Sequence, residues 1–79
     1  MDKDELKRRT KQFALRVMKL AAALPNLPVA WTICQQLTDS GTSVGANYRA
    51  ACRARTRPEF IAKLGVVSEE ADESAFWLE

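Results

Sequence analysis

The sequence predicts an all-α protein, a helical bundle with three helices in a single domain over residues 1–79. Apolar residues recur at intervals of three and four along most of the chain, which is the period of a helix with one buried face. The three prolines fall at two breaks in this pattern, between residues 25 and 28 and at residue 58. We therefore expect helices over about residues 2–24, 29–55 and 57–78.

The first predicted helix, residues 2–24, contains no Gly or Pro and is rich in Lys, Arg, Leu and Ala, which are good helix formers. Acidic residues in its first turn suit the positive end of the helix dipole. One apolar stripe is expected to face the core, and its members are Leu6, Phe13, Ala14, Val17, Leu20, Ala21 and Leu24. A second stripe of Leu15, Met18 and Ala22 indicates another contact, either within the bundle or between subunits.

Pro25 and Pro28 predict a short turn, because proline donates no backbone hydrogen bond and disfavours helical geometry in the residue before it. The second helix, residues 29–55, keeps its apolar spacing through Gly41 without losing phase. Its predicted buried face consists of Ala30, Ile33, Leu37, Gly41, Val44, Tyr48 and Ala51. A loop at residues 40–42 that joins two shorter helices is the alternative.

The stretch from Ser40 to Arg55 is the most specific part of the chain, because small residues are concentrated in it. Gly41 and Gly45 each cost about 1 kcal/mol relative to alanine in a helix interior, so we expect them to permit close approach of another helix. Asn47 lies among these small residues and can form a hydrogen bond across that contact, since a buried amide needs a partner. The residues that we assign to helix packing or an interface are Ser40, Gly41, Ser43, Gly45, Asn47 and Trp77.

Thr56 and Glu59 predict the start of the third helix. Thr56 can accept a hydrogen bond at the N-cap, Glu59 can return one as a capping box, and Pro58 fits the first turn. The expected core stripe is Phe60, Leu64, Val67, Ala71, Ser74 or Ala75, and Leu78. The sequence ends inside this pattern, so the last turn at residues 76–78 frays, meets a partner or continues in a longer chain.

The length of the chain and its two cysteines indicate how the protein is stabilised and in which redox environment it is expected. A single core in a chain this short supplies only about 3–5 kcal/mol, so we expect self-association to bury additional area. Cys34 and Cys52 lie 18 residues apart, which is about 27 Å along one helix and too far for a disulfide. A reduced, cytoplasmic environment is therefore expected. No apolar run approaches the ~20 residues needed to cross a membrane, so we expect no membrane partner.

Most of the chain resembles a known family of proteins. The segments QLTDSGTSVGANYRAACRAR and PEFIAKLGVVSEEADESAFWLE are similar to the four-helix bundle proteins first noticed as reading frames inside intervening sequences of 23S rRNA genes. The opening KRRTKQFALRVMKLAAALPN is similar to the first helix of that family. Residues 40–43 together with Asn47 are the most specific part of the resemblance.

The resemblance implies antiparallel helices assembled as a ring-shaped homopentamer, without an established biochemical function. A related branch includes the basic accessory protein that works with the reverse transcriptase of diversity-generating retroelements, which implies binding to RNA, ribonucleoprotein or a nucleic-acid enzyme. The chain departs from the family at Ala50, where an acidic residue is usual, so an ion pair at that position is not expected. We expect three helices in this chain, with the fourth helix of the family, which would follow Trp77, absent or truncated.

The composition argues against an enzyme. There is no histidine, so neither a Ser-His nor a Cys-His catalytic pair can form. Glu69, Glu70, Asp72 and Glu73 are interpreted as a solvated acidic face, because carboxylate-bridged metal sites in bundles use Glu-x-x-His pairs. The two cysteines are interpreted as buried structural residues rather than reactive thiols. We expect no metal and no cofactor.

Charge is unevenly distributed, although the net charge is only +2. Residues 1–56 hold ten Lys and Arg against four Asp and Glu, and residues 57–79 hold two against six. We hypothesise that a basic surface binds RNA or DNA through phosphate contacts. The candidate residues are Lys7, Arg8, Lys11, Arg49, Arg53 and Arg55. Pairing of these arginines with the acidic third helix is the alternative for the charges, and a protein-interaction scaffold without a nucleic-acid role is the alternative function.

Overall fold

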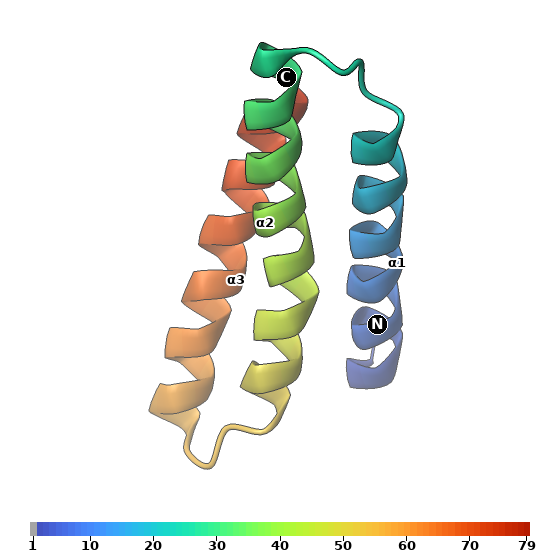
Figure 1. The fold of residues 1–79 in the computed structure, drawn as a ribbon. Helices are drawn as coiled ribbons and strands as arrows, with labels where there is room; N and C mark the ends of the chain where they lie inside the picture. The colour runs from blue at the N-terminus through green and yellow to red at the C-terminus, as the bar shows by residue number, and fades with distance from the viewer. Residues whose placement is uncertain (1) are drawn as a thin grey trace.

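The computed structural model describes residues 2–79, which form three α helices and no strand. The helices are α1 (Lys3–Ala22), α2 (Pro28–Cys52) and α3 (Arg57–Leu78). They lie lengthwise in a body of 45 × 20 × 17 Å, and α2 runs antiparallel to both neighbours (Figure 1). The predicted all-α bundle is confirmed.

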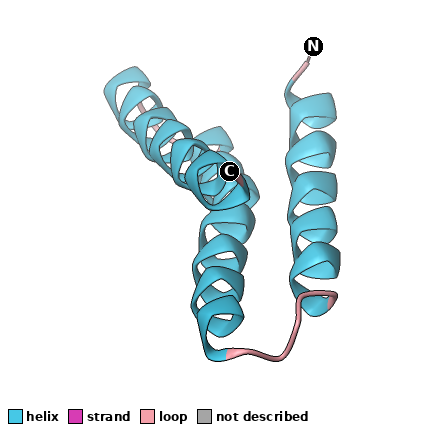
Figure 2. Cartoon of the chain, turned by 90° about the horizontal axis from the view of Figure 1, so that it is seen from above, coloured by secondary structure: helices cyan, strands magenta, loops and turns pink. Residues whose placement is uncertain are grey.

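Helix α2 is the central helix of the bundle. It packs against α1 and against α3, whereas no Cα atom of α1 lies within 8 Å of one in α3. Figure 2 shows α1 standing apart from α3, joined to α2 by a short loop. The buried apolar residues consequently belong to α1 and α2, and they are Ala14, Val17, Ala21, Ala30, Leu37, Val44, Tyr48 and Ala51.

The glycine-rich segment lies inside α2, so the alternative of a loop at residues 40–42 is wrong. A Cβ atom added to Gly41 would lie 2.8 Å from Cγ1 of Val17, and one added to Gly45 would lie 3.3 Å from the carbonyl oxygen of Thr10. Both contacts are made with α1. The absence of a side chain at these two positions therefore allows α1 and α2 to approach closely.

A pair of buried hydroxyl groups joins α2 to α3. Ser40 and Ser74 are 2% and 1% exposed, and their oxygen atoms lie 3.1 Å apart. Each hydroxyl also lies within hydrogen-bond distance of a carbonyl oxygen in its own helix, at 3.3 Å for Ser40 and 2.9 Å for Ser74. Because a buried hydroxyl costs free energy unless it is hydrogen-bonded, this pair favours one register between the two helices.

Glu70 lies one turn before Ser74 and is half-buried near other carboxylates. Burial raises the pKa of Glu70 above its ordinary value of 4.5, and the nearby Glu73, Glu69 and Asp39 raise it further. The ionised form of Glu70 is therefore less favourable in the folded protein than in the unfolded chain.

Two helices are shorter than predicted. The first helix ends at Ala22 rather than residue 24, and the second ends at Cys52 rather than residue 55. After both residues, the next two backbone N–H groups bond to carbonyl oxygens three residues back, which closes the helix with a tighter turn. The second helix begins at Pro28, where the missing N–H of proline costs no helical hydrogen bond.

The predicted start of α3 is confirmed at Thr56, whose hydroxyl accepts a hydrogen bond from the N–H of Glu59 at 3.2 Å. The return bond of the capping box differs from the prediction. The carboxylate of Glu59 accepts from the N–H of Arg55, also at 3.2 Å, and not from that of Thr56. Asp2 caps α1 in a similar way by accepting from the N–H of Glu5 at 2.7 Å.

Several apolar residues predicted for the core are exposed. Leu20 and Leu78 are 45% and 50% exposed, and Ala71 is exposed as well. The reason is geometric, because α1 and α3 each contact α2 on one side and do not cover each other. Leu15 and Met18 are also 50% and 41% exposed, so the second contact expected for their stripe is not made within residues 2–79.

We expect Gly41→Ala to be less stable than Gly65→Ala by about 1–3 kcal/mol. Both variants gain helix propensity, but the methyl group at position 41 would meet Val17, which is β-branched and only 3% exposed. Nothing lies within 4 Å of a Cβ atom added to Gly65. Urea unfolding of both variants measures the difference in their free energies of unfolding. If both variants are stabilised equally relative to the unmodified protein, Gly41 is not closely packed.

We expect Glu70→Gln to stabilise the protein at neutral pH and to have little effect at acidic pH. Because the pKa of Glu70 is raised on folding, its contribution favours folding below the unfolded value of 4.5 and is lost as the pH rises through the folded pKa. Urea unfolding at the two pH values measures the effect. The control Asp72→Asn removes one charge from an exposed position of α3, and an equal gain there would assign the effect to net charge alone.

Candidate nucleic-acid interface

Three of the six predicted basic residues line one cleft between α1 and α2, which we call the basic cleft. They are Lys7 and Lys11 of α1 and Arg49 of α2, and the cleft has a volume of about 280 Å³. The other lining residues are Ala14, Met18, Thr42, Gly45 and Ala46. Because this lining contains no carboxylate, the basic cleft presents positive charge to an anionic ligand.

Close packing of α1 on α2 produces this arrangement. Lys7 and Lys11 are four residues apart and share one face of α1. Thr10 is buried between them, and its hydroxyl bonds to carbonyl oxygens of its own helix at 2.9 and 3.1 Å. Gly45 approaches the backbone of Thr10, and Arg49 follows Gly45 by one turn on the same face of α2. The glycine thus brings Arg49 near the two lysines.

The structure does not bring Arg8, Arg53 or Arg55 into the basic cleft. Arg8 lies on another face of α1, where its guanidinium is 3.9 Å from the carboxylate of Glu5. Arg53 follows the end of α2 and Arg55 lies in the turn before α3, and both are exposed. Among the described residues, neither they nor Arg49 form an ion pair with α3. The acidic third helix therefore does not neutralise these arginines by direct contact.

The small residues assigned to packing have three different partners. Gly41 and Gly45 face α1, and Ser40 faces α3. Ser43 and Asn47 instead bond within α2, each donating to the carbonyl oxygen one turn before it, at 2.6 and 2.9 Å. Within residues 2–79, the hydrogen bond predicted from Asn47 across to another helix is not formed, because its amide N–H donates to this local carbonyl instead.

Trp77 lies in the last turn of α3, which points toward the same end of the bundle as the turn between α1 and α2 (Figure 1). Its ring packs edge to face on Phe76, with ring centroids 4.9 Å apart. Trp77 is half-buried and Phe76 is 65% exposed. The exposed large apolar residues near this end, which we call the apolar end, are Leu20, Leu27, Val29, Trp31, Phe76 and Leu78.

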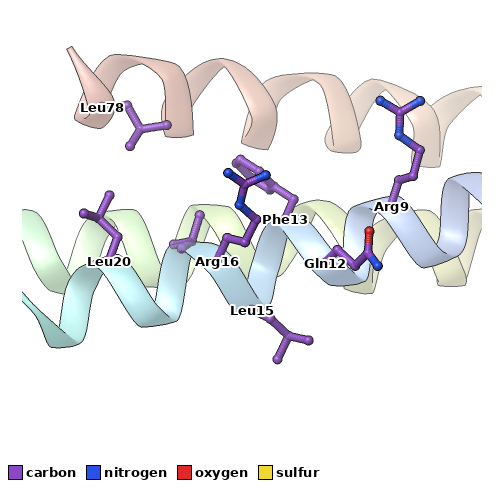
Figure 3. A pocket seen from close by; sticks show the side chains of 8 residues that line it. Arg9, Gln12, Phe13, Leu15, Arg16, Leu20 and Leu78 are labelled. Atoms are coloured by element: carbon purple, nitrogen blue, oxygen red, sulfur yellow. The ribbon is translucent and has the colours of Figure 1, made fainter.

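A larger hollow of about 940 Å³ lies between α1 and α3. Its lining consists of Arg9, Gln12, Phe13, Leu15, Arg16, Val17, Leu20 and Leu78. In Figure 3, the side chains of Arg9, Phe13 and Arg16 point from α1 toward the space beneath α3, and Leu78 lies on the opposite helix. The hollow exists because α1 and α3 both pack on α2 and not on each other.

The sequence assigns Met18 to an apolar stripe and Ala46 to the small-residue segment of the second helix, but it does not place either residue beside the cations of the basic cleft. A signal for Met18 is present, since Lys7, Lys11, Ala14 and Met18 follow one another at helical spacing on one face of α1. No comparable spacing connects Ala46 to the two lysines. Its position in the cleft depends on how closely α2 approaches α1.

Both cysteines lie on α2 as free, half-buried thiols. The thiol of Cys34 donates to the carbonyl oxygen of Ala21 at 3.6 Å. Cys52 lies beside Tyr48, whose pKa is raised by burial and then by this neighbouring thiol. The phenol of Tyr48 therefore stays protonated at physiological pH.

The acidic residues of α3 form no site of their own. Glu69, Asp72 and Glu73 are exposed, while Glu70 is half-buried. Over residues 2–79, no group of three or more Asp, Glu or Cys side chains is arranged to hold a metal ion. Nor does this part of the chain contain a helix with the length and apolar character needed to span a membrane.

The chain is similar to a known protein family and to a solved structure. The model of the 23S rRNA-intervening sequence protein family matches residues 3–79. A crystal structure of a protein with unknown function from the S23 ribosomal protein family of Bacteroides thetaiotaomicron is 37% identical, with a TM-score of 0.89. The similarity covers 99% of this chain and 70% of that chain. No curated protein matches.

Proposed function

Because the chain belongs to the family of 23S rRNA-intervening sequence proteins, we propose that it is a non-catalytic helical-bundle protein that binds RNA through the basic cleft. The family predicted from the sequence is confirmed, whereas RNA binding is the proposal made here. The family name connects these proteins with ribosomal RNA genes, and neither that name nor the solved structure indicates a catalytic activity.

The charged lining of the basic cleft is the observation that supports this proposal. Lys7, Lys11 and Arg49 line it together without a carboxylate, so all three charges remain available to phosphate groups. Lysine ammonium groups act as point charges, while a guanidinium can bind one phosphate through two N–H groups. Arg53 and Arg55 extend the positive charge beyond the end of α2, because they are exposed and have no ion pair with α3.

We expect Lys11→Ala to weaken binding of labelled RNA and to make the binding less dependent on salt. Each phosphate contact contributes about 0.7 to the slope of log affinity against log salt for a single strand, so the slope should fall by about that amount. Fluorescence anisotropy across several salt concentrations measures both quantities, and labelled DNA in a parallel titration measures the preference for RNA.

The matched control for this experiment is Lys19→Ala. It removes the same charge from an exposed position of α1 that does not line the basic cleft. If the two variants lose RNA affinity equally, the binding depends on overall charge and not on the basic cleft. No binding by the unmodified protein at low salt would contradict the proposed function itself.

The apolar end supports a second proposal, self-association. Soluble monomers rarely expose large contiguous apolar patches, and here Trp31, Phe76 and Leu78 are each at least half exposed. A homopentameric ring is the assembly that the family resemblance implies. In the alternative function, a protein-interaction scaffold, the same surface receives a different protein.

We expect sedimentation equilibrium above micromolar concentration to detect oligomers, and Phe76→Glu to shift the distribution toward smaller species. A charge at this position opposes burial of the apolar end. The control is Ile61→Glu, which adds the same charge at a 58% exposed position near the start of α3. A monodisperse monomer for the unmodified protein would exclude self-association.

A further inference from the structure

Apolar residues line the basic cleft together with its three cations, and two of them, Met18 and Ala46, are accessible to a ligand. Met18 is 41% exposed, and Ala46 beside it is exposed as well. Thr42 offers little to a ligand, because its hydroxyl already donates to the carbonyl oxygen of Thr38 at 2.7 Å. Phosphate groups alone do not explain this lining, since a phosphate gains nothing from contact with a thioether or a methyl group.

We propose that the basic cleft binds single-stranded RNA, with one unstacked base against Met18 and Ala46 and the neighbouring phosphates on Lys7, Lys11 and Arg49. This inference rests on the proposed RNA binding and names the class of RNA that the cleft accepts. The volume of about 280 Å³ lies just below the range for small-ligand sites, as expected for one base and not for an extended groove.

An unpaired nucleotide presents an apolar face and a negative charge within one residue. In a double helix the bases are stacked and paired, so the outer surface presents mainly phosphates and sugars to a cleft of this kind. An unpaired base exposes a π-face, which stacks on side chains whatever the sequence. Mixed apolar and basic character therefore favours a single strand over a duplex.

The side chains around the cleft have the chemistry for such a contact. The thioether of Met18 is polarisable and interacts favourably with aromatic rings. The planar guanidinium of Arg49 can stack on a base or bind a phosphate. Gly45 holds α2 close to Thr10, so the lining of the cleft comes from two closely packed helices.

Ala46→Leu tests this inference, because it adds bulk to the lining of the cleft without changing any charge. Ala46 is exposed, and leucine is also a good helix former, so the substitution should not disturb the fold. We expect the affinity for a mixed-sequence single-stranded RNA of about twelve nucleotides to fall about tenfold, the size of effect expected from loss of a stacked base. The affinity for a duplex RNA of the same length should not change.

Ala62→Leu on α3 is the matched control, since it adds the same side chain at an exposed position away from the cleft, and neither affinity should change. Thermal unfolding checks that both variants are folded. If Ala46→Leu proves unstable, Met18→Ser provides a second test, because it removes the thioether from the lining of the cleft while leaving the three cations in place.

The outcomes separate this inference from the proposed function. If the unmodified protein binds the duplex as tightly as the single strand, or Ala46→Leu weakens both equally, the inference is overturned and RNA binding remains. If neither RNA binds, both the inference and the proposed function are overturned. If a polyglutamate peptide binds as tightly as the single strand and is displaced by Ala46→Leu, the cleft belongs to an acidic protein partner and the inference also fails.

Discussion

Helix α2 packs against α1 on one side and α3 on the other, while the Cα atoms of α1 and α3 stay more than 8 Å apart. This arrangement constrains which residues α2 can carry. On one side, Gly41 and Gly45 leave room for Val17 and the backbone of Thr10. On the other side, the hydroxyl of Ser40 lies within hydrogen-bond distance of the hydroxyl of Ser74 in α3. Small side chains are required on both sides because larger ones would hold the helices apart. The glycines reduce helix propensity, and close packing with α1 offsets that loss.

The same arrangement leaves apolar surface uncovered. Because α1 and α3 each contact α2 and not each other, Phe13 and Leu20 border a hollow instead of a filled core, with Leu78 on its far side. Arg9 and Arg16 line the hollow on the α1 side, so its lining combines apolar and positively charged side chains. A chain of this size buries limited area by itself, which gives the exposed residues a physical reason to contact another molecule.

Close packing also connects the fold to the proposed chemistry. Gly45 allows α2 to approach α1 at Thr10, and Arg49, one turn after Gly45, then lines a single cleft with Lys7 and Lys11. A bulkier residue at position 45 would separate Arg49 from Lys7 and Lys11 without altering any charge. The basic cleft is therefore a product of helix packing, and its uncharged lining is mainly apolar because that is the composition of the adjoining helix faces.

The amino-acid sequence by itself determined the three helices, the buried face of α2 and the N-cap at Thr56. These features depend on periodicity and on hydrogen bonds between residues close in the chain, which the sequence specifies directly. It also determined that Lys7 and Lys11 share a face, since both lie on one helix. Only the tertiary structure decided that Arg49 joins them while Arg8 does not. Helical periodicity gives the direction of a side chain around its own axis, but the distance and rotation of a neighbouring helix depend on how side chains pack between the two.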